Sequence, residues 1–183
     1  MRAFVSVDCD PLADEIRERQ DPLRDVAGLR LVDPANTHVT LKFLGDVPTG
    51  RVSAVREALS EAVASTGLAP FDLRLGGYGA FPSSDYISVV WLGVQSGGSE
   101  LTRLQEAVET RLVELGFDAE DHDFTPHVTI ARMDHAAGKD HVQRLLGEPA
   151  TGTTAMRVEH VSLTESTLTK EGPVYSTVAS IPL

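Results

Sequence analysis

The sequence predicts an α+β fold of two pseudo-symmetric lobes, each with an antiparallel sheet and outer helices, around a central groove. Segments that alternate between polar and apolar residues predict strands, and segments with apolar residues every three or four positions predict helices. The order strand, helix, strand with the tripeptide His-Val-Thr occurs twice. The tripeptides begin at His38 and His127, 89 positions apart in a chain of 183 residues, a spacing that an ancient duplication would leave.

The first half of the chain begins with residues 2–8, whose alternation and content of Val and Phe predict a strand. Asp10, interpreted as a helix cap before Pro11, opens a helix with helically spaced apolar residues as far as Leu23. The Gly-Gly-Tyr-Gly-Ala-Phe-Pro-Ser-Ser sequence after residue 75 predicts a turn. The other expected elements are strands over 29–32, 38–44 and 71–75 and a helix over 49–65 that Thr49 or Ser53 could cap.

The second half repeats this order. A strongly apolar strand over 86–94 precedes a helix over 99–115, which Gly116 ends. Phe-Thr-Pro then leads into the strand that starts at His127. The last expected elements are a short helix at about 138–146 and strands over 156–165 and 174–181. No linker or low-complexity segment divides the chain, so we expect residues 1–183 to form one domain of two interleaved lobes.

The chain is strongly acidic, with a formal net charge of -11. Of its 16 basic residues only three are lysine, namely Lys42, Lys139 and Lys170. Acidic excess with scarce lysine favours a halophilic protein, with an ordinary acidic cytosolic protein as the alternative. Because long nucleic-acid tracks are basic, the charge argues against such a track and favours recognition of an RNA end at a small site.

The cysteine content and the hydropathy indicate a cytoplasmic protein. Cys9 is the only cysteine, so no internal disulfide can form, which favours a reducing compartment. No apolar run approaches the roughly 20 residues of a membrane-spanning helix, and the N-terminal segment is too short for a signal peptide. We therefore expect no membrane partner, and we expect a monomer.

The two motifs carry side chains suited to proton transfer. Residues i and i+2 of a strand point to the same face, so His38 and Thr40 share a face, as do His127 and Thr129. Opening a cyclic phosphodiester with water needs a base, an acid and donors to the phosphate oxygens. Imidazole suits both proton roles, and threonine hydroxyls can donate to phosphate, so this chemistry needs no metal or other cofactor.

These motifs resemble those of the 2H phosphoesterase superfamily, named for two His-x-Thr-x motifs. The similarity is greatest to its RNA 2′,3′-cyclic phosphodiesterase branch, also called 2′-5′ RNA ligase-like proteins. It spans nearly the whole chain. The stretches that carry it are RAFVSVD, LRLVDPANTHVTLKFLGDV, FDLRLGGYGAFPS, FTPHVTIAR and VYSTVASIPL.

The resemblance implies a role for each motif residue. His38 would be the proton donor to the leaving ribose oxygen, and His127 would be the proton acceptor that activates water. Thr40 and Thr129 would bind the phosphate, together with Arg132, which matches an arginine that often follows the second motif. The implied reaction opens a terminal 2′,3′-cyclic phosphate to a 2′-phosphomonoester, and some family members also join or cleave 2′-5′ linkages.

Strict alternation gives a different phosphate-binding cation. It places Ala131, rather than Arg132, on the face of His127. Lys42 shares the face of the first motif histidine and is therefore a rival phosphate ligand. Phe43 falls on the opposite face, where we expect it in the core rather than stacked against a base.

Other candidate motifs give weaker evidence of a functional site. The three glycines at 76, 77 and 79 do not open a helix as a dinucleotide-binding loop does. Asp8-Cys9-Asp10 superficially suggests an aspartyl-nucleophile phosphatase, but Pro and Leu follow where that motif needs Thr or Gly. Four more histidines lack metal-ligand spacing and are expected on the surface: His122, His135, His141 and His160.

The sequence therefore predicts a metal-independent phosphodiesterase whose active-site groove acts on an RNA end or small nucleotide with a 2′,3′-cyclic phosphate. One alternative is a related enzyme that acts on a small cyclic or 2′-5′-linked nucleotide. The other is a catalytically silent module that binds RNA ends. Binding alone does not require two titrating groups, so the two histidines favour an enzyme.

Overall fold

The computed structural model describes all residues from 1 to 183 as nine strands and four α-helices, joined by short 3-10 turns and loops. The strands are β1 (Arg2–Asp8), β2 (Leu29–Leu31), β3 (His38–Asp46), β4 (Phe71–Pro82), β5 (Ile87–Ser96), β6 (His127–Met133), β7 (Met156–Val158), β8 (His160–Thr169) and β9 (Gly172–Pro182). The helices are α1 (Ala13–Gln20), α2 (Val52–Thr66), α3 (Gly98–Glu114) and α4 (Lys139–Leu146).

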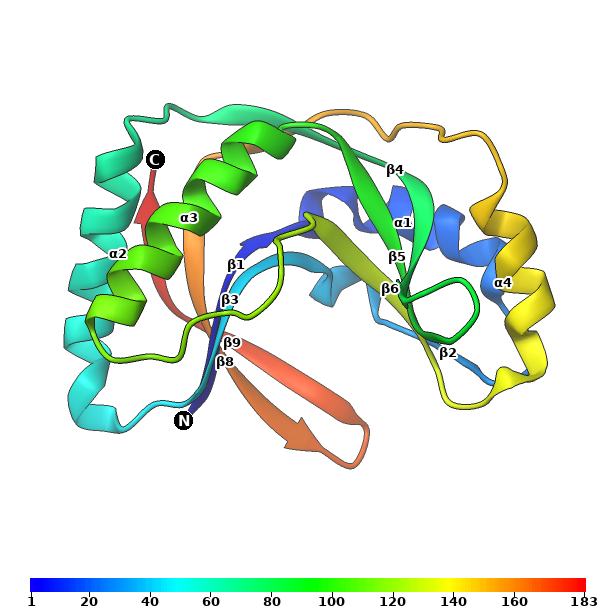
Figure 1. Ribbon diagram of the computed structural model, residues 1–183, viewed down its shortest axis with the longest axis horizontal. Helices are drawn as coiled ribbons and strands as arrows, with labels where there is room; N and C mark the ends of the chain where they lie inside the picture. Colours follow the sequence, from blue (N-terminus) through cyan, green and yellow to red (C-terminus); the bar gives the residue numbers. More distant parts are fainter.

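The strands form two antiparallel half-sheets. The order is β7-β4-β5-β6-β3-β1-β8-β9, with β2 also paired to β6. The half-sheets meet only where Val39 of β3 pairs with Val128 of β6. On either side of this bridge β3 and β6 separate, so each motif strand belongs to its own lobe (Figure 1).

Two helices contact the lobe opposite to that of the strand that precedes them in the chain. Helix α1 follows β1 but contacts β6, whereas α3 follows β5 but contacts β3. Helices α2 and α3 lie side by side over the lobe of β1, β3, β8 and β9, and α4 contacts β4 in the other lobe (Figure 1). A single cluster of 36 buried apolar residues draws from both lobes. None of the four helices is long and apolar enough to cross a membrane.

The predicted fold class is confirmed, and one expected turn is wrong. The glycine-rich segment after residue 75 continues β4 as far as Pro82. Leu75 pairs with Val94 and Tyr78 with Leu92, so the two intervening glycines form a bulge, and Gly77 has a φ of 78°. These glycines therefore permit a kink within a strand instead of ending it.

The expected helix caps are also wrong. Asp10 lies within a 3-10 turn whose N-cap is Cys9, and no side-chain hydrogen bond caps it. Helix α2 begins after a 3-10 turn that contains Thr49, and its N-cap is Arg51, again without a side-chain cap. Proline at or before the first turn fixes the backbone in both cases, so the turn can begin without a capping hydroxyl or carboxylate.

Candidate active site

The bridge between the half-sheets sets the two motifs against each other. Val39 and Val128 are fully buried, so they point away from the side chains on either side of them in each strand. In an antiparallel pair the residues next to a bridge are also opposed and point to the same face. The bridge therefore fixes which motif side chains are neighbours.

Each motif histidine lies opposite the threonine of the other motif. Counting one residue from the bridge places His38 opposite Thr129, and Thr40 opposite His127. All four side chains are partly exposed. We name the side of β3 and β6 that carries them the motif face. Two imidazoles and two hydroxyls can thus act on one small group bound there.

Both imidazoles are held in the same tautomer. The Nδ1 atom of His38 lies 2.9 Å from the carbonyl oxygen of Asn36, and that of His127 lies 2.6 Å from the carbonyl oxygen of Thr125. Because a carbonyl oxygen only accepts, Nδ1 carries the hydrogen in both rings. The Nε2 atom of each ring is then free to accept a proton when neutral or to donate one when charged.

Each histidine ring is also flanked by two aromatic rings, which restrict its orientation and exclude water from its faces. The ring centroid of His38 lies 4.7 Å from that of Phe4 and 5.4 Å from that of Tyr175. The ring centroid of His127 lies 4.9 Å from that of Phe81 and 5.6 Å from that of Trp91. The motifs alone do not reveal these aromatic residues, because they come from strands that are distant from the motifs in the chain.

Burial lowers the pKa of both histidines below the ordinary value of 6.5. For His38, the hydrogen bond to Asn36 and the carboxylate of Asp8 act against burial and raise its pKa. The positive charges of His127 and Arg132 lower the pKa of His38 further. Groups from the two lobes therefore share one electrostatic environment.

A bulge in β3 changes which residues follow the first motif on this face. Strand β1 pairs with Thr40 and then with Lys42, skipping Leu41. Leu41 and Lys42 are both buried, at 3% and 2% exposure, and alternation resumes out of phase. Phe43 therefore returns to the motif face with 66% exposure. The expectation of a core position for Phe43 is wrong.

The same bulge occurs in β6. Strand β5 pairs with Thr129 and then with Ala131, skipping Ile130. Ile130 and Ala131 are fully buried, and the next residue, Arg132, is exposed. The bulge thus brings Arg132 to the motif face, where burial raises the pKa of Tyr175 and the positive charge of Arg132 partly opposes that rise. Strict alternation had instead placed Ala131, rather than Arg132, on the face of His127.

Lys42 does not lie on the motif face, and its prediction as a phosphate ligand is wrong. Its side chain is 1% exposed and points toward α3. The Nζ atom lies 2.6 Å from Oε2 of Glu109 and donates to the carbonyl oxygen of Asp118 at 2.8 Å. The β3 bulge turns the lysine from the motif face to the helix side of the sheet.

None of the remaining histidines lies on β3 or β6. His122, His135 and His160 are exposed as expected, whereas His141 is partly buried. His122 is paired with Asp121, which raises its pKa and leaves it a solvated surface group.

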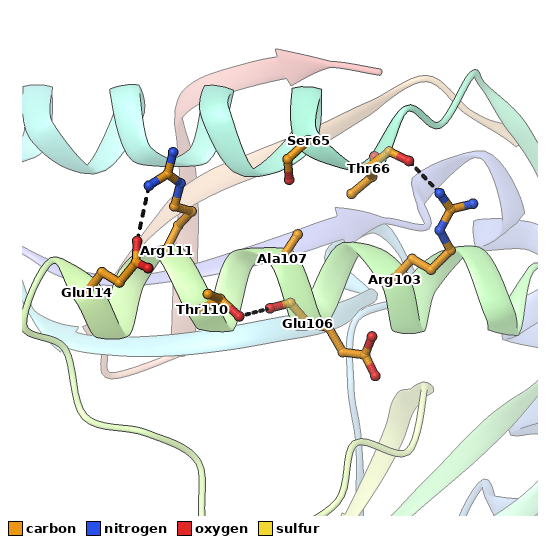
Figure 2. A pocket seen from close by; sticks show the side chains of 8 residues that line it. All are labelled: Ser65, Thr66, Arg103, Glu106, Ala107, Thr110, Arg111 and Glu114. Atoms are coloured by element: carbon orange, nitrogen blue, oxygen red, sulfur yellow. Dashed lines mark hydrogen bonds and ion pairs between the residues drawn. The ribbon is translucent and has the colours of Figure 1, made fainter.

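A polar hollow of about 420 Å³ lies between α2 and α3 (Figure 2). Its guanidinium groups are already paired: Arg103 donates to the carbonyl oxygen of Thr66, and Arg111 contacts Glu114 at 3.1 Å and Glu61 at 2.8 Å. The hollow lies on the helix side of the lobe, away from the motif face. It presents no free cation for a phosphate.

The similarity to known proteins extends over nearly the whole chain. A family model for the 2′-5′ RNA ligase superfamily matches residues 10–169. The RNA 2′,3′-cyclic phosphodiesterase of Methanothermobacter thermautotrophicus is 37% identical, with 96% of this chain and 95% of that protein covered. The protein of the same name from Archaeoglobus fulgidus is 39% identical, with 96% of each chain covered.

Solved structures share the fold. TT0787 of Thermus thermophilus matches with a TM-score of 0.83 and 28% identity over 100% of this chain and 98% of that chain. E. coli LigT, solved with 3′-AMP, matches with a TM-score of 0.79 and 22% identity over 100% of this chain and 97% of that one. The family match, the identities and the paired histidine motifs agree, and the chain belongs to the 2′-5′ RNA ligase superfamily of 2H phosphoesterases.

Proposed function

We propose that this protein opens the 2′,3′-cyclic phosphate at an RNA end to a 2′-phosphomonoester by metal-independent acid and base catalysis. The observation that carries the proposal is the crossed arrangement on the motif face, where each histidine lies opposite the threonine of the other motif. The relatives named RNA 2′,3′-cyclic phosphodiesterase, at up to 39% identity, support the choice of substrate.

The reaction uses the two free Nε2 atoms. Neutral His127 accepts a proton from water while the water oxygen forms a bond to phosphorus. The bond from phosphorus to the ribose 3′ oxygen breaks, and protonated His38 donates its Nε2 proton to that oxygen. The products are a 2′-phosphate and a 3′-hydroxyl group. Proton exchange with solvent then returns both rings to their starting states.

Three other groups bind the phosphate in this proposal. The hydroxyls of Thr40 and Thr129 donate to its non-bridging oxygens, as does the guanidinium of Arg132. Charge that builds up on those oxygens in the transition state is thereby stabilised by donors already in place. The β6 bulge supports the role of Arg132, because it brings that side chain to the motif face.

The proposed substrate is a nucleic-acid end rather than a long strand. Phe43, at 66% exposure and with its ring centroid 6.3 Å from that of Phe4, can stack against the terminal base. A net charge of -11 disfavours an extended RNA track beyond this point.

The single buried cysteine, Cys9, fits a monomer in the reducing cytoplasm. The apolar cluster shared by both lobes supports the proposal that residues 1–183 form one domain.

An assay with an oligonucleotide that ends in a 2′,3′-cyclic phosphate tests this function. We expect conversion to the 2′-phosphate, identified by ³¹P NMR, at the same rate with and without excess EDTA. The same oligonucleotide with a 3′-phosphate end serves as the control and should not react. Turnover only of cyclic mononucleotides or 2′-5′-linked dinucleotides would favour the related small-molecule enzyme, and tight binding without turnover would favour the silent module.

A further inference from the structure

The two halves of the site are nearly symmetric, yet the reaction needs one charged and one neutral histidine. We propose that Asp8 is a positioning residue whose carboxylate favours the protonated form of His38, so that His38 rather than His127 serves as the acid. The assignment of the acid rests on the proposed function. The interaction of Asp8 with His38 can be measured without any substrate.

The strand registers show where the symmetry fails. Beside the first motif, β1 places Asp8 opposite His38. Beside the second motif, β5 places Gly93 opposite His127. Both registers run through the motif with the same single skipped residue, so Asp8 and Gly93 occupy equivalent positions. One histidine therefore faces a carboxylate and the other faces a residue without a side chain.

The carboxylate of Asp8 is held in place by two hydroxyl groups. Ser6 Oγ donates to Oδ1 at 3.1 Å, and Ser162 Oγ donates to Oδ2 at 2.7 Å. Ser6 is fully buried and Ser162 is 1% exposed, so this support is shielded from solvent. The carboxylate makes no direct ion pair with His38 and acts on the ring through space.

The backbone disfavours an equivalent carboxylate beside His127. A Cβ atom at Gly93 would lie 3.2 Å from the carbonyl oxygen of Gly76, tighter than an ordinary contact. No acidic side chain contributes to the pKa of His127, which is set by burial and by its backbone hydrogen bond. The difference between the two histidines is thus built into the sheet.

The charged and titratable groups around His38 define the test. Asp8 faces it from β1, Tyr175 from β9, and His127 and Arg132 from β6. Burial and the two cationic groups lower the pKa of His38, whereas Asp8 raises it. Removing the negative charge of Asp8 should therefore favour the neutral form of His38 alone.

The first experiment is an NMR titration of both histidines in the free protein with Asp8→Asn. We expect the titration midpoint of His38 to fall by roughly one pH unit and that of His127 to stay unchanged. Asp10→Asn is the matched control, because it removes the same charge from an exposed carboxylate two residues away. Equal shifts of both histidines, or no shift of His38, would overturn the proposal.

A second variant, Ser162→Ala, gives the opposite sign and serves if Asp8→Asn does not fold. It removes a donor from the carboxylate but keeps the charge, so the field at His38 becomes more negative and its midpoint should rise. A fall of the His38 midpoint in Ser162→Ala would contradict the proposal.

The kinetic counterpart is the pH dependence of cyclic-phosphate opening. The alkaline limb of the rate should move to lower pH in Asp8→Asn by the same amount as the His38 midpoint, with KM unchanged. A limb that stays in place while the His38 midpoint moves would show that His38 is not the acid and would overturn that assignment. If the wild-type protein does not open the cyclic phosphate, the proposed function fails, while the titration still decides whether Asp8 controls His38.

Discussion

Arg132 and Phe43 occupy corresponding positions in the two motif strands. Each follows its motif threonine by three residues, after a bulge that buries the two residues between. The two sites are equivalent in backbone and opposite in chemistry, with a cation in one lobe and an aromatic ring in the other. A nucleotide with a cyclic phosphate has an anionic group that a cation can bind and a base that an aromatic ring can stack against.

Replacing these two residues should separate phosphate binding from base binding. Arg132→Ala removes a charged donor, so kcat/KM should fall about 10- to 100-fold, in line with about 1.5–3 kcal/mol for a hydrogen bond to a charged group. Arg157→Ala, at an exposed surface pair with Asp72, is the control and should leave kcat/KM unchanged. An unchanged kcat/KM in Arg132→Ala would remove Arg132 from the site.

Phe43→Ala should weaken binding of the nucleoside but not of phosphate. Loss of one stacking surface costs about 1–3 kcal/mol, so KM for an oligonucleotide should rise about 5-fold or more. Inhibition by inorganic phosphate should be the same as in the wild-type protein. Weaker inhibition by phosphate in Phe43→Ala would instead indicate that the variant distorts the motif strand.

Lys42→Met should affect stability rather than phosphate binding. It leaves Glu109 partly buried without its cation, and removing one partner of a buried pair costs up to about 3 kcal/mol. Urea unfolding should show this loss, and the double variant Lys42→Met/Glu109→Gln should recover part of it. A stable Lys42→Met protein that no longer binds phosphate would restore Lys42 as a ligand.

The lowered pKa values of His38 and His127 predict a loss of stability in acid. The unfolded chain, with ordinary histidine values near 6.5, binds protons at a pH where the folded protein does not. This contribution is complete above about pH 6.5 and is lost as the pH falls through the lowered folded values. Urea unfolding should therefore show a smaller acid loss for His38→Gln/His127→Gln, and an identical loss would refute the burial effect.

The acidic surface predicts a dependence on salt. With a net charge of -11, repulsion between carboxylates should be screened in molar KCl, and Tm should rise relative to low salt. Thermal melts in the two conditions measure this directly. Equal Tm values would contradict the halophilic interpretation and favour an ordinary acidic protein.

Alternation along single strands predicted the part of the site that lies before the bulges. It placed His38 with Thr40 correctly on one face because no irregularity separates them. It failed for Lys42 and Phe43 because a bulge depends on the partner strand, which one segment of sequence does not reveal. Bulges near a site re-aim side chains in this way, and here each motif strand has one directly after its motif threonine.

Residues from distant strands were harder to predict. The alternation of residues 2–8 places Phe4, Ser6 and Asp8 on one face, but it does not tell which strand pairs with them. Only the register of β1 against β3 shows that Asp8 faces His38. The glycines of β4 were misread for a related reason, since Gly79 is required by the ring of Trp91 on the neighbouring strand.

The central claim is that one histidine from each lobe carries a proton, and single-turnover rates on a cyclic-phosphate-ended oligonucleotide test it most directly. We expect His38→Ala and His127→Ala each to lose about 10²- to 10⁴-fold in rate with the fold intact by circular dichroism. His160→Ala, an exposed histidine on β8, should keep the wild-type rate. A rate within about tenfold of wild type in either motif variant would contradict the two-histidine mechanism.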